Sequence, residues 1–372
     1  MKLLFLNTNI GYGGASKMIV TIANYFADAG HEVYFLTYRD TECHQTLSKN
    51  VCLIQESIEG HSNKLLGFWR TVRFVRHVIQ SQMIDVSVAF LSPSQLRLSI
   101  AAVGTKTKLV FSQRGDPYYR YSSLFYRIIN PIVDYFFSRA DGYVFQTNGA
   151  RDFSSNSIRS RSIVIPNPID PIVRTKSRVD GIEKRIVSVA RLQIWQKRQD
   201  LLIEAFKLLG DVSQEYTLDL YGDGQDESRL KSLAEGNPHI RFMGKISNVG
   251  DKIQNAAIFV LSSDFEGIPN SLLEAMSLGI PCISTDCSPG GAAMLIDNRH
   301  NGLLVPRGDA EALSNAIRFF IENPEEAEIM GNNARVVNSY ILRQLFFQSG
   351  KHFLLNYANK IIIKSTSIQK IF

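Results

Sequence analysis

Two glutamates stand close together where the chain is predicted to leave a buried strand and enter a helix. Glu266 follows the apolar run 257–262 (AIFVLS), and Glu274 lies eight residues further on in the predicted helix 270–278. Ligands of open α/β sheets bind beyond the carboxyl ends of the strands, where carboxylates can accept hydrogen bonds from sugar hydroxyl groups. The alternative is a capping carboxylate and a second glutamate that faces solvent.

The segment between these glutamates adds backbone groups to the same place. Asn270 or Ser271 is the expected N-cap of the helix, and a helix N-terminus favours an anion. We therefore expect the following residues to bind substrate together with Glu274: Gly267, Ile268, Pro269, Asn270 and Ser271.

Two basic residues occupy the corresponding place after an earlier strand. Arg191 follows the run 185–190 (RIVSVA), and Lys197 precedes the predicted helix 198–209. Two cations at the ligand edge of a sheet suit a diphosphate, because they form charge-assisted hydrogen bonds with its oxygens. A salt bridge within the loop is the alternative for Arg191.

A glycine loop follows the first predicted strand, 2–7 (KLLFLN). Gly13 and Gly14 precede a helical pattern over 15–29, so the backbone can approach an anion closely there. The loop does not match G-x-G-x-x-G, and no acidic residue ends the second strand, 31–37, so a dinucleotide site is disfavoured. A tight turn without a ligand is the alternative.

These candidate residues are positioned by predicted strands and helices that alternate along the chain, which is typical of a doubly wound parallel sheet. The other predicted strands are 84–91, 108–112, 142–146, 162–165, 216–221, 239–243 and 280–284. The other predicted helices are 63–80, 226–235, 248–255 and 341–357.

A proline-rich segment, 166–171 (PNPIDP), interrupts the pattern and cannot continue a helix or a central strand. Charged residues without clear periodicity then run to about Lys184. We therefore predict an α/β chain of two Rossmann-like, doubly wound parallel-sheet domains. Their bounds are 1–170 and 171–340, followed by a C-terminal helix and tail over 341–372.

The order and spacing of these motifs resemble glycosyltransferase family 4. The segment 262–285 (SSDFEGIPNSLLEAMSLGIPCIST) is similar to the donor-site signature of that family. Other segments similar to family motifs are the glycine loop, the Arg191 and Lys197 pair, 165–168 (IPNP), 220–224 (LYGDG) and 301–305 (NGLLV). The resemblance covers nearly the whole chain and is weakest over 40–140. It implies the GT-B fold, in which two domains face a cleft and the last helix crosses back to the first domain.

By this resemblance the chain is a retaining hexosyltransferase. It would move a hexose or an N-acetylhexosamine from a nucleotide sugar, expected to be a UDP-sugar, to a glycan or lipid-linked acceptor in surface polysaccharide biosynthesis. Glu274 would hold the ribose hydroxyls, and Glu266 would contact the donor sugar. Arg191 and Lys197 would stabilise the departing diphosphate, which the glycine loop would approach from the first domain.

No metal or other cofactor is expected, since the resemblance implies metal-independent chemistry. The sequence contains no D-x-D motif, which usually bridges a metal ion and a diphosphate. The two cations and the helix N-terminus would neutralise the leaving group instead.

Three features depart from the family pattern. Lys197 lies one residue further from Arg191 than in many members, with Trp195 in the insertion. Arg114 and Asp116 stand where many members have a histidine, and they are candidates for the acceptor side. The third departure is a methionine at position 294, where an acidic residue is common.

The net excess of positive charge lies in the first half of the chain. Residues 1–170 contain 18 Lys and Arg against 12 Asp and Glu, a balance of +6, whereas residues 171–372 contain 23 of each. A basic half suits an anionic membrane surface or an anionic ligand. Within helix 63–80, apolar residues form a stripe and basic residues lie largely elsewhere, which indicates either packing on its own domain or an interfacial helix. Nucleic acid is disfavoured, because no nucleic-acid motif accompanies the charge.

The four cysteines show no C-x-x-C spacing, so neither a zinc site nor a disulfide framework is expected. No run reaches 18 apolar residues, so no transmembrane helix is expected. We expect a cytoplasmic protein, with peripheral contact at the inner face of the membrane as an alternative. Two other function classes stay open: a non-catalytic nucleotide- or polysaccharide-binding module on the same fold and, less favoured, a nicotinamide dehydrogenase.

Overall fold

The computed structural model of the protein describes residues 1–11, 14–39, 46–56, 64–90, 92–117, 131, 134–166, 181–246 and 248–337. The chain divides into two compact units between Ile165 and Pro166. The predicted domain boundary at 170 and 171, the predicted helix 341–357 and Gly13 lie outside the described residues.

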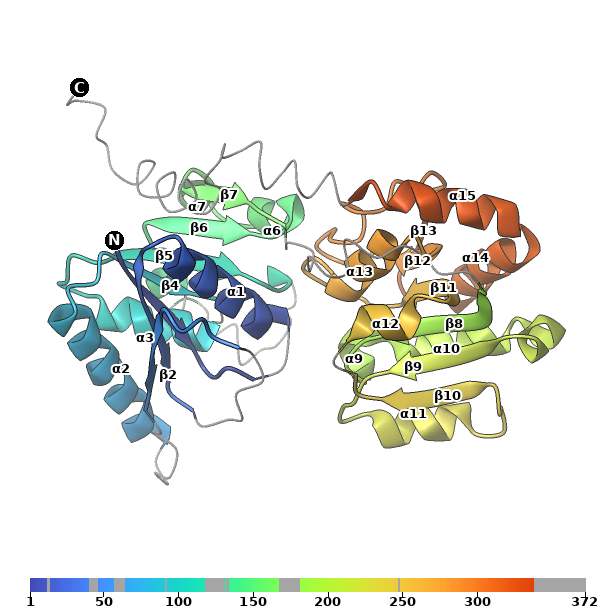
Figure 1. The fold of residues 1–372 in the computed structure, drawn as a ribbon, viewed down its shortest axis with the longest axis horizontal. Helices are drawn as coiled ribbons and strands as arrows, with labels where there is room; N and C mark the ends of the chain where they lie inside the picture. Colours follow the sequence, from blue (N-terminus) through green and yellow to red (C-terminus); the bar gives the residue numbers. More distant parts are fainter. Residues whose placement is uncertain are drawn as a thin grey trace. The chain divides into compact units, whose positions relative to one another are not determined.

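The first unit is built on a parallel sheet in which seven strands follow the order β3-β2-β1-β4-β5-β6-β7 (Figure 1). The strands are β1 (Lys2–Asn7), β2 (Glu32–Thr37), β3 (Val51–Gln55), β4 (Val86–Ala89), β5 (Lys108–Gln113), β6 (Gly142–Phe145) and β7 (Ser162–Val164). Its helices include α1 (Gly14–Asp28), α2 (Lys64–Ser81), α3 (Ser92–Ala101), α6 (Asn148–Asp152) and α7 (Asn156–Arg159).

Helices cover both faces of this sheet. Successive side chains of a strand point to opposite faces. In β1, Leu4 and Leu6 therefore join the core that contains Val75 of α2, whereas Phe5 packs on Phe26 of α1 with ring centroids 6.2 Å apart. Burial on both faces explains why the central strands read as continuous apolar runs.

The second unit has a parallel sheet of six strands in the order β10-β9-β8-β11-β12-β13. The strands are β8 (Glu183–Val189), β9 (Thr217–Tyr221), β10 (Ile240–Gly244), β11 (Ala256–Leu261), β12 (Cys282–Thr285) and β13 (Leu303–Val305). The helices are α9 (Ile194–Lys197), α10 (Gln199–Lys207), the 3-10 helix η1 (Gly210–Gln214), α11 (Glu227–Ala234), α12 (Val249–Ile253), α13 (Asn270–Leu278), α14 (Ala310–Glu322) and α15 (Pro324–Ala334).

Most predicted elements lie within two residues of the observed ones, and the differences have local causes. The strand β3 was not expected, although its residues 51–54 (VCLI) are apolar, because a run of four apolar residues does not by itself distinguish a strand from a buried helix segment. The helices α3, α6, α7, α9, α14 and α15 were also not among the predicted ones. The charged stretch predicted to reach Lys184 ends earlier, because β8 already begins at Glu183.

Each sheet reverses its winding beside its first strand. The strand β1 pairs with both β2 and β4, and β8 pairs with both β9 and β11. In open α/β sheets, a ligand crevice forms outside the carboxyl ends of the strands at such a topological switch point. The loops after β1 and β4, and those after β8 and β11, are therefore where functional side chains are expected.

Candidate active site

The loops that follow β8 and β11 are joined at the switch point of the second sheet. The Asp264 N–H donates to the Gln196 carbonyl at 2.9 Å, and Gln196 Nε2 donates to the Phe265 carbonyl at 3.1 Å. Ser262 Oγ donates to the Lys197 carbonyl at 2.8 Å. These contacts join residues about 65 positions apart in the sequence, so the two loops form one structural unit.

Lys197 and Glu266 meet in this unit as an ion pair. Their side chains are only 17% and 11% exposed. Ser263 Oγ donates to the same Glu266 Oε1 at 2.9 Å, and the Glu266 N–H donates to the Ser288 carbonyl at 2.7 Å. A charge pair withdrawn from water in this way requires both its counter-charge and additional hydrogen bonds. The pair therefore fixes one cation and one carboxylate at the ligand edge.

A second ion pair, which the sequence did not reveal, supports the first. Arg198 lies between α9 and α10 with φ 49° and ψ 43°, a left-handed conformation that is uncommon for a non-glycine residue. Its guanidinium donates to Asp264 at 3.1 Å and to Asp200 at 3.2 Å. Arg198 and Asp264 each adjoin or lie near a predicted site residue, but no spacing pattern distinguished them.

Arg191 has a fixed backbone and an exposed side chain. Its carbonyl accepts a hydrogen bond from Gln199 Nε2 at 2.7 Å. An ideal Cβ on Gly222 would lie 2.0 Å from the Ala190 carbonyl oxygen, so only glycine allows the turn after β9 to pack here. Within the described parts of the chain, no hydrogen bond or ion pair holds the Arg191 guanidinium.

The helix α13 begins at Asn270, and Pro269 occupies its N-cap with φ −73° and ψ 106°. The prediction that Asn270 or Ser271 caps this helix is therefore wrong. Proline carries no side-chain acceptor, so it leaves first-turn N–H groups for another partner. By contrast, the Asp309 carboxylate caps α14 by accepting from the Ala312 N–H at 2.8 Å.

The rest of the predicted donor segment also lies at this end of α13. Ile268 and Pro269 are buried, Gly267 is half-buried, and Glu274 lies partly exposed in the second turn. A neighbouring turn supports Gly267, because an ideal Cβ on Gly291 would lie 1.6 Å from the Gly267 carbonyl oxygen. The absence of a side chain at position 291 therefore allows the two backbones to touch.

Cys287 lies in the buried turn that packs behind Glu266. Burial, followed by the nearby negative charge of Glu266, raises the pKa of the Cys287 thiol to about 12. The thiol is therefore neutral at physiological pH and acts as a small apolar group in the wall of the site.

The first unit places its own candidate residues at the carboxyl edge of its sheet. Gly14 is the first residue of α1, directly after the loop that follows β1. Arg114 follows β5, and its guanidinium carbon lies 4.3 Å from the ring centroid of Phe90. Asp116 is partly exposed two residues later.

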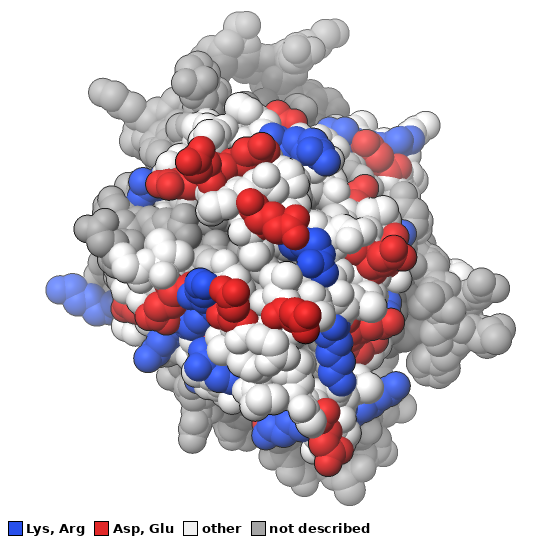
Figure 2. Space-filling model, turned by 90° about the vertical axis from the view of Figure 1, so that its right-hand side faces the viewer, with Lys and Arg blue, Asp and Glu red and all other residues white. Residues whose placement is uncertain are grey.

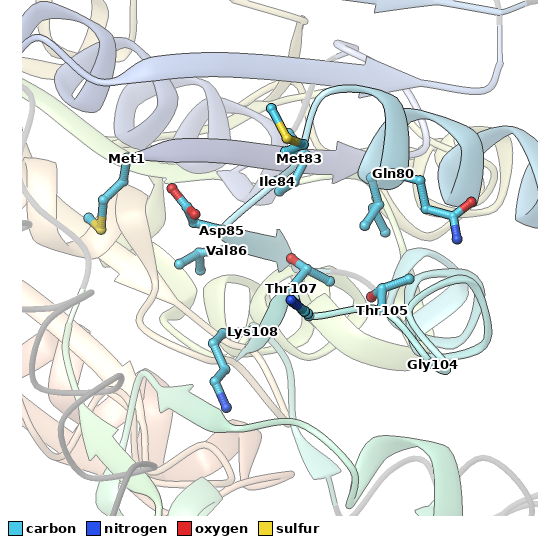
Figure 3. A pocket seen from close by; sticks show the side chains of 12 residues that line it. Met1, Gln80, Met83, Ile84, Asp85, Val86, Gly104, Thr105, Thr107 and Lys108 are labelled. Atoms are coloured by element: carbon cyan, nitrogen blue, oxygen red, sulfur yellow. The ribbon is translucent and has the colours of Figure 1, made fainter. Parts of the chain in front are cut away.

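A cavity of about 790 Å³ opens at the opposite, amino-terminal edge of this sheet (Figure 3). Met1 precedes β1, Asp85 precedes β4, and Lys108 begins β5, so the cavity lies away from the switch point. Asp85 already accepts from the Lys2 N–H at 2.8 Å, and Lys108 pairs with Asp141 at 3.1 Å. Two charged groups of the cavity lining, Asp85 and Lys108, are thus engaged within the protein.

The surface charge of the second unit agrees with its balanced composition. Figure 2 shows acidic and basic side chains interspersed over the face in view, without a large area of one sign. In the described ranges, no group of three or more His, Cys, Asp or Glu is arranged to hold a metal ion. The helices in those ranges include none that is long and apolar enough to span a membrane.

Comparison with solved structures defines the class of this fold. The Anabaena protein HepE, solved in complex with UDP, superposes with a TM-score of 0.78 at 18% identity and covers 98% of this chain and 100% of its own. With two doubly wound parallel sheets and this structural neighbour, the chain has the GT-B fold of glycosyltransferases.

Matches to two family models then show which family the chain belongs to. The model described as Glycosyltransferase Family 4 matches residues 12–172, and the model described as Glycosyl transferases group 1 matches residues 170–337. The chain belongs to the family 4-type glycosyltransferases, and the resemblance predicted from the motifs is confirmed.

Two curated relatives match over most of their length. One is a Campylobacter jejuni α-1,4-N-acetyl-D-galactosaminyltransferase that acts on a diphosphate-undecaprenol-linked GalNAc glycan, 25% identical over 90% of this chain and 93% of its own. The other is the amylovoran biosynthesis glycosyltransferase AmsD of Erwinia amylovora, 21% identical over 80% of this chain and 84% of its own.

Proposed function

We propose that this glycosyltransferase moves a hexose or an N-acetylhexosamine from a UDP-sugar to a glycan or lipid-linked acceptor, with retention of the anomeric configuration. The observation that carries the proposal is the buried Lys197–Glu266 pair at the switch point of the second sheet. The names of the relatives support the acceptor class and a role in surface polysaccharide biosynthesis, and the UDP complex of HepE supports the donor class.

Each residue of this site has a proposed role in holding the donor. Glu274 accepts hydrogen bonds from the ribose hydroxyls, and Glu266 contacts the donor sugar near the reacting carbon. Arg191 and Lys197 bind the diphosphate, whose charge also faces the first turn of α13. Gly13 and Gly14 approach the phosphates from the first domain.

The proposed reaction needs no metal, because charge on the leaving diphosphate is neutralised by these cations and by the helix N-terminus. The bond between the anomeric carbon and the diphosphate oxygen breaks, and the acceptor oxygen attacks from the same face. Its proton passes to a phosphate oxygen of the leaving group. Arg114 and Asp116 stay candidates for contacts on the acceptor side.

The test is a thermal-shift screen of nucleotide sugars, followed by product analysis with the best donor. We expect Glu274→Ala to weaken UDP-sugar binding and Arg191→Ala to lower kcat about 100-fold, the usual effect of removing one group that stabilises a developing oxyanion. Proton NMR of the product reports whether the anomeric configuration is retained. Unchanged UDP affinity and unchanged rates in both variants would contradict the donor site.

A non-catalytic binding module on this fold is the remaining alternative. It would bind nucleotide sugars but show neither acceptor-dependent transfer nor slow donor hydrolysis. The same screen therefore separates the two functions.

We also propose that the basic first domain contacts an anionic membrane surface through the first turns of α2. Val72, Val75, Val78 and Ile79 of this helix are buried in the core. Ahead of them, the side chains of Leu65, Leu66 and Trp69 are 65%, 56% and 46% exposed. Exposed Arg70 and Arg73 adjoin these apolar side chains, a combination that suits insertion among anionic headgroups. The proposed location is cytoplasmic, at the inner face of the membrane.

A further inference from the structure

Arg97 is a partly buried cation of the first unit. Its guanidinium carbon lies 4.6 Å from the ring centroid of Tyr38 and 4.8 Å from that of Phe68. Its Nη1 donates to the Pro93 carbonyl at 2.9 Å, whereas its buried Nε has no hydrogen-bond partner. Among the residues that the structure describes, no carboxylate forms an ion pair with it.

The electrostatic surroundings make this position costly for a cation. Burial lowers the pKa of Arg97, Tyr38 opposes that effect, and the positive charge of Arg39 adds to it. The guanidinium nevertheless stays protonated. The Tyr38 and Phe68 rings attract the cation, but an aromatic ring does not replace the hydrogen bonds that the guanidinium N–H groups can form.

Hydroxyl groups from three segments gather beside the Tyr38 ring. The Tyr38 hydroxyl lies 3.0 Å from Thr8 Oγ1 and 3.1 Å from Ser94 Oγ. Thr8 follows β1, Tyr38 follows β2, and Ser94 lies in the first turn of α3, after β4. This cluster therefore occupies the carboxyl edge of the first sheet at its switch point.

Two further observations place unsatisfied polar groups at that edge. Because Arg97 bonds to the carbonyl of Pro93, four residues earlier, its guanidinium lies at the first turn of α3. Asn7, the last residue of β1, is 1% exposed, and its Oδ1 has no hydrogen-bond partner. Buried polar atoms are normally paired with a protein group or an ordered water; as an acceptor, this oxygen can pair with a water or a hydroxyl group but not with an ionised phosphate oxygen.

We propose that Arg97 binds a phosphate or diphosphate group of the acceptor at the switch point of the first sheet. The planar fork of a guanidinium matches phosphate oxygens, and the hydroxyl cluster at Tyr38, whose two internal hydrogen bonds leave one hydroxyl proton, can add one neutral hydrogen bond. This inference rests on the proposed function, since it assigns the acceptor to the first domain. The phosphates of the donor have the same chemistry, so the test must separate the two sources.

The experiment titrates the full chain with inorganic pyrophosphate by isothermal calorimetry, with and without saturating UDP. In the presence of UDP, we expect pyrophosphate to bind the wild-type protein and Arg97→Gln to weaken that binding about tenfold or more. Tyr38→Phe retains the ring and should weaken it about threefold, the loss of one neutral hydrogen bond. The matched control is Arg76→Gln, which removes an arginine of α2 that donates to the Val103 carbonyl at 2.7 Å.

The remaining outcomes overturn the proposal. Pyrophosphate affinity that is unchanged in Arg97→Gln would remove Arg97 from the site. Loss of wild-type pyrophosphate binding when UDP is present, or loss of UDP affinity in Arg97→Gln, would assign the residue to the donor. Failure of UDP to bind the wild-type protein would instead contradict the proposed function. If Arg97→Gln does not fold, Tyr38→Phe decides the question, and unchanged pyrophosphate affinity in it contradicts the proposal.

Discussion

The Lys197–Glu266 pair links the stability of the second unit to its chemistry. Both side chains are largely withdrawn from water, and Ser263 supplies a further hydrogen bond to the carboxylate. Removal of one partner leaves an uncompensated charge, whereas removal of both leaves none. Single and double variants can therefore separate the contribution of the pair to stability from its contribution to activity.

We expect Lys197→Met and Glu266→Gln each to lower the Tm, and the double variant to recover part of the loss. The coupling free energy should be about 1–3 kcal/mol. Transferase activity should stay about 100-fold or more below wild type in all three variants, because both residues are proposed to act on the donor. Thermal melts and initial rates measure the two effects. Additive losses of stability would show that the pair is not coupled.

Cys287 gives a second prediction about a single residue. With a pKa of about 12, only about one thiol in ten thousand is ionised at pH 8. Iodoacetamide should therefore modify exposed Cys52 but not buried Cys282 or Cys287, as measured by mass spectrometry in a Cys43→Ser background. Labelling of Cys287 without denaturant would contradict the burial.

The same shift has a defined effect on stability. The thiol ionises at its ordinary value of 9.0 in the unfolded chain and at about 12 in the folded protein. Cys287 therefore makes stability fall as the pH rises from about 9 to 12. A Cys287→Ser variant should lack that component of the alkaline destabilisation.

Among the elements, α13 differs from α14 in how its N-terminus is satisfied. Asp309 caps α14 with its own carboxylate, whereas Pro269 contributes no acceptor to α13. A negative group placed in the first turn of α13 should thus stabilise the helix and compete with a bound diphosphate. Helix stability should therefore rise while diphosphate affinity falls, so measuring both quantities tests whether a diphosphate binds at this end of α13.

We expect Ser271→Asp to stabilise α13 by about 0.3–1 kcal/mol and to weaken UDP binding about tenfold or more through charge repulsion. Calorimetry and thermal melts measure these changes. Ser228→Asp is the matched control, because Ser228 is likewise the second residue of a helix, α11, in the same unit. An equal loss of UDP affinity in both variants would indicate a long-range charge effect instead of contact with α13.

At the scale of the whole molecule, the first half of the chain combines an excess of positive charge with exposed apolar side chains in the first turns of α2. Trp69 and Trp195 are the two tryptophans of the chain, and only Trp69 lies in α2. Tryptophan fluorescence can therefore report on the proposed membrane contact at a single position.

In a Trp195→Phe background, we expect Trp69 emission to shift to shorter wavelength with phosphatidylglycerol vesicles but not with phosphatidylcholine vesicles. Replacing Arg70 and Arg73 by Gln should weaken binding by about 2 kcal/mol, about 1 kcal/mol for each charge near the surface. The control is Trp69→Phe, in which Trp195 should show no shift. Binding of equal strength to both vesicle types would contradict the electrostatic part of the proposal.

The sequence by itself determined most of the strands, several of the helices and the candidate residues. Strand and helix periodicity is local, so apolar runs such as those that became β1 and β11 were recognisable from their own residues. The order of the motifs also predicted the family. Edge strand β3 was missed because its apolar run, 51–54 (VCLI), is too short to distinguish a strand from a buried helix segment.

Tertiary structure decided which of these residues meet. Lys197 and Glu266 are 69 positions apart, and they pair because β11 lies beside β8 in the sheet. The cap of α13 by Pro269 and the unsatisfied Nε of Arg97 likewise follow from backbone geometry and burial. Strand order and burial arise from contacts between distant segments, and local periodicity contains no information about them.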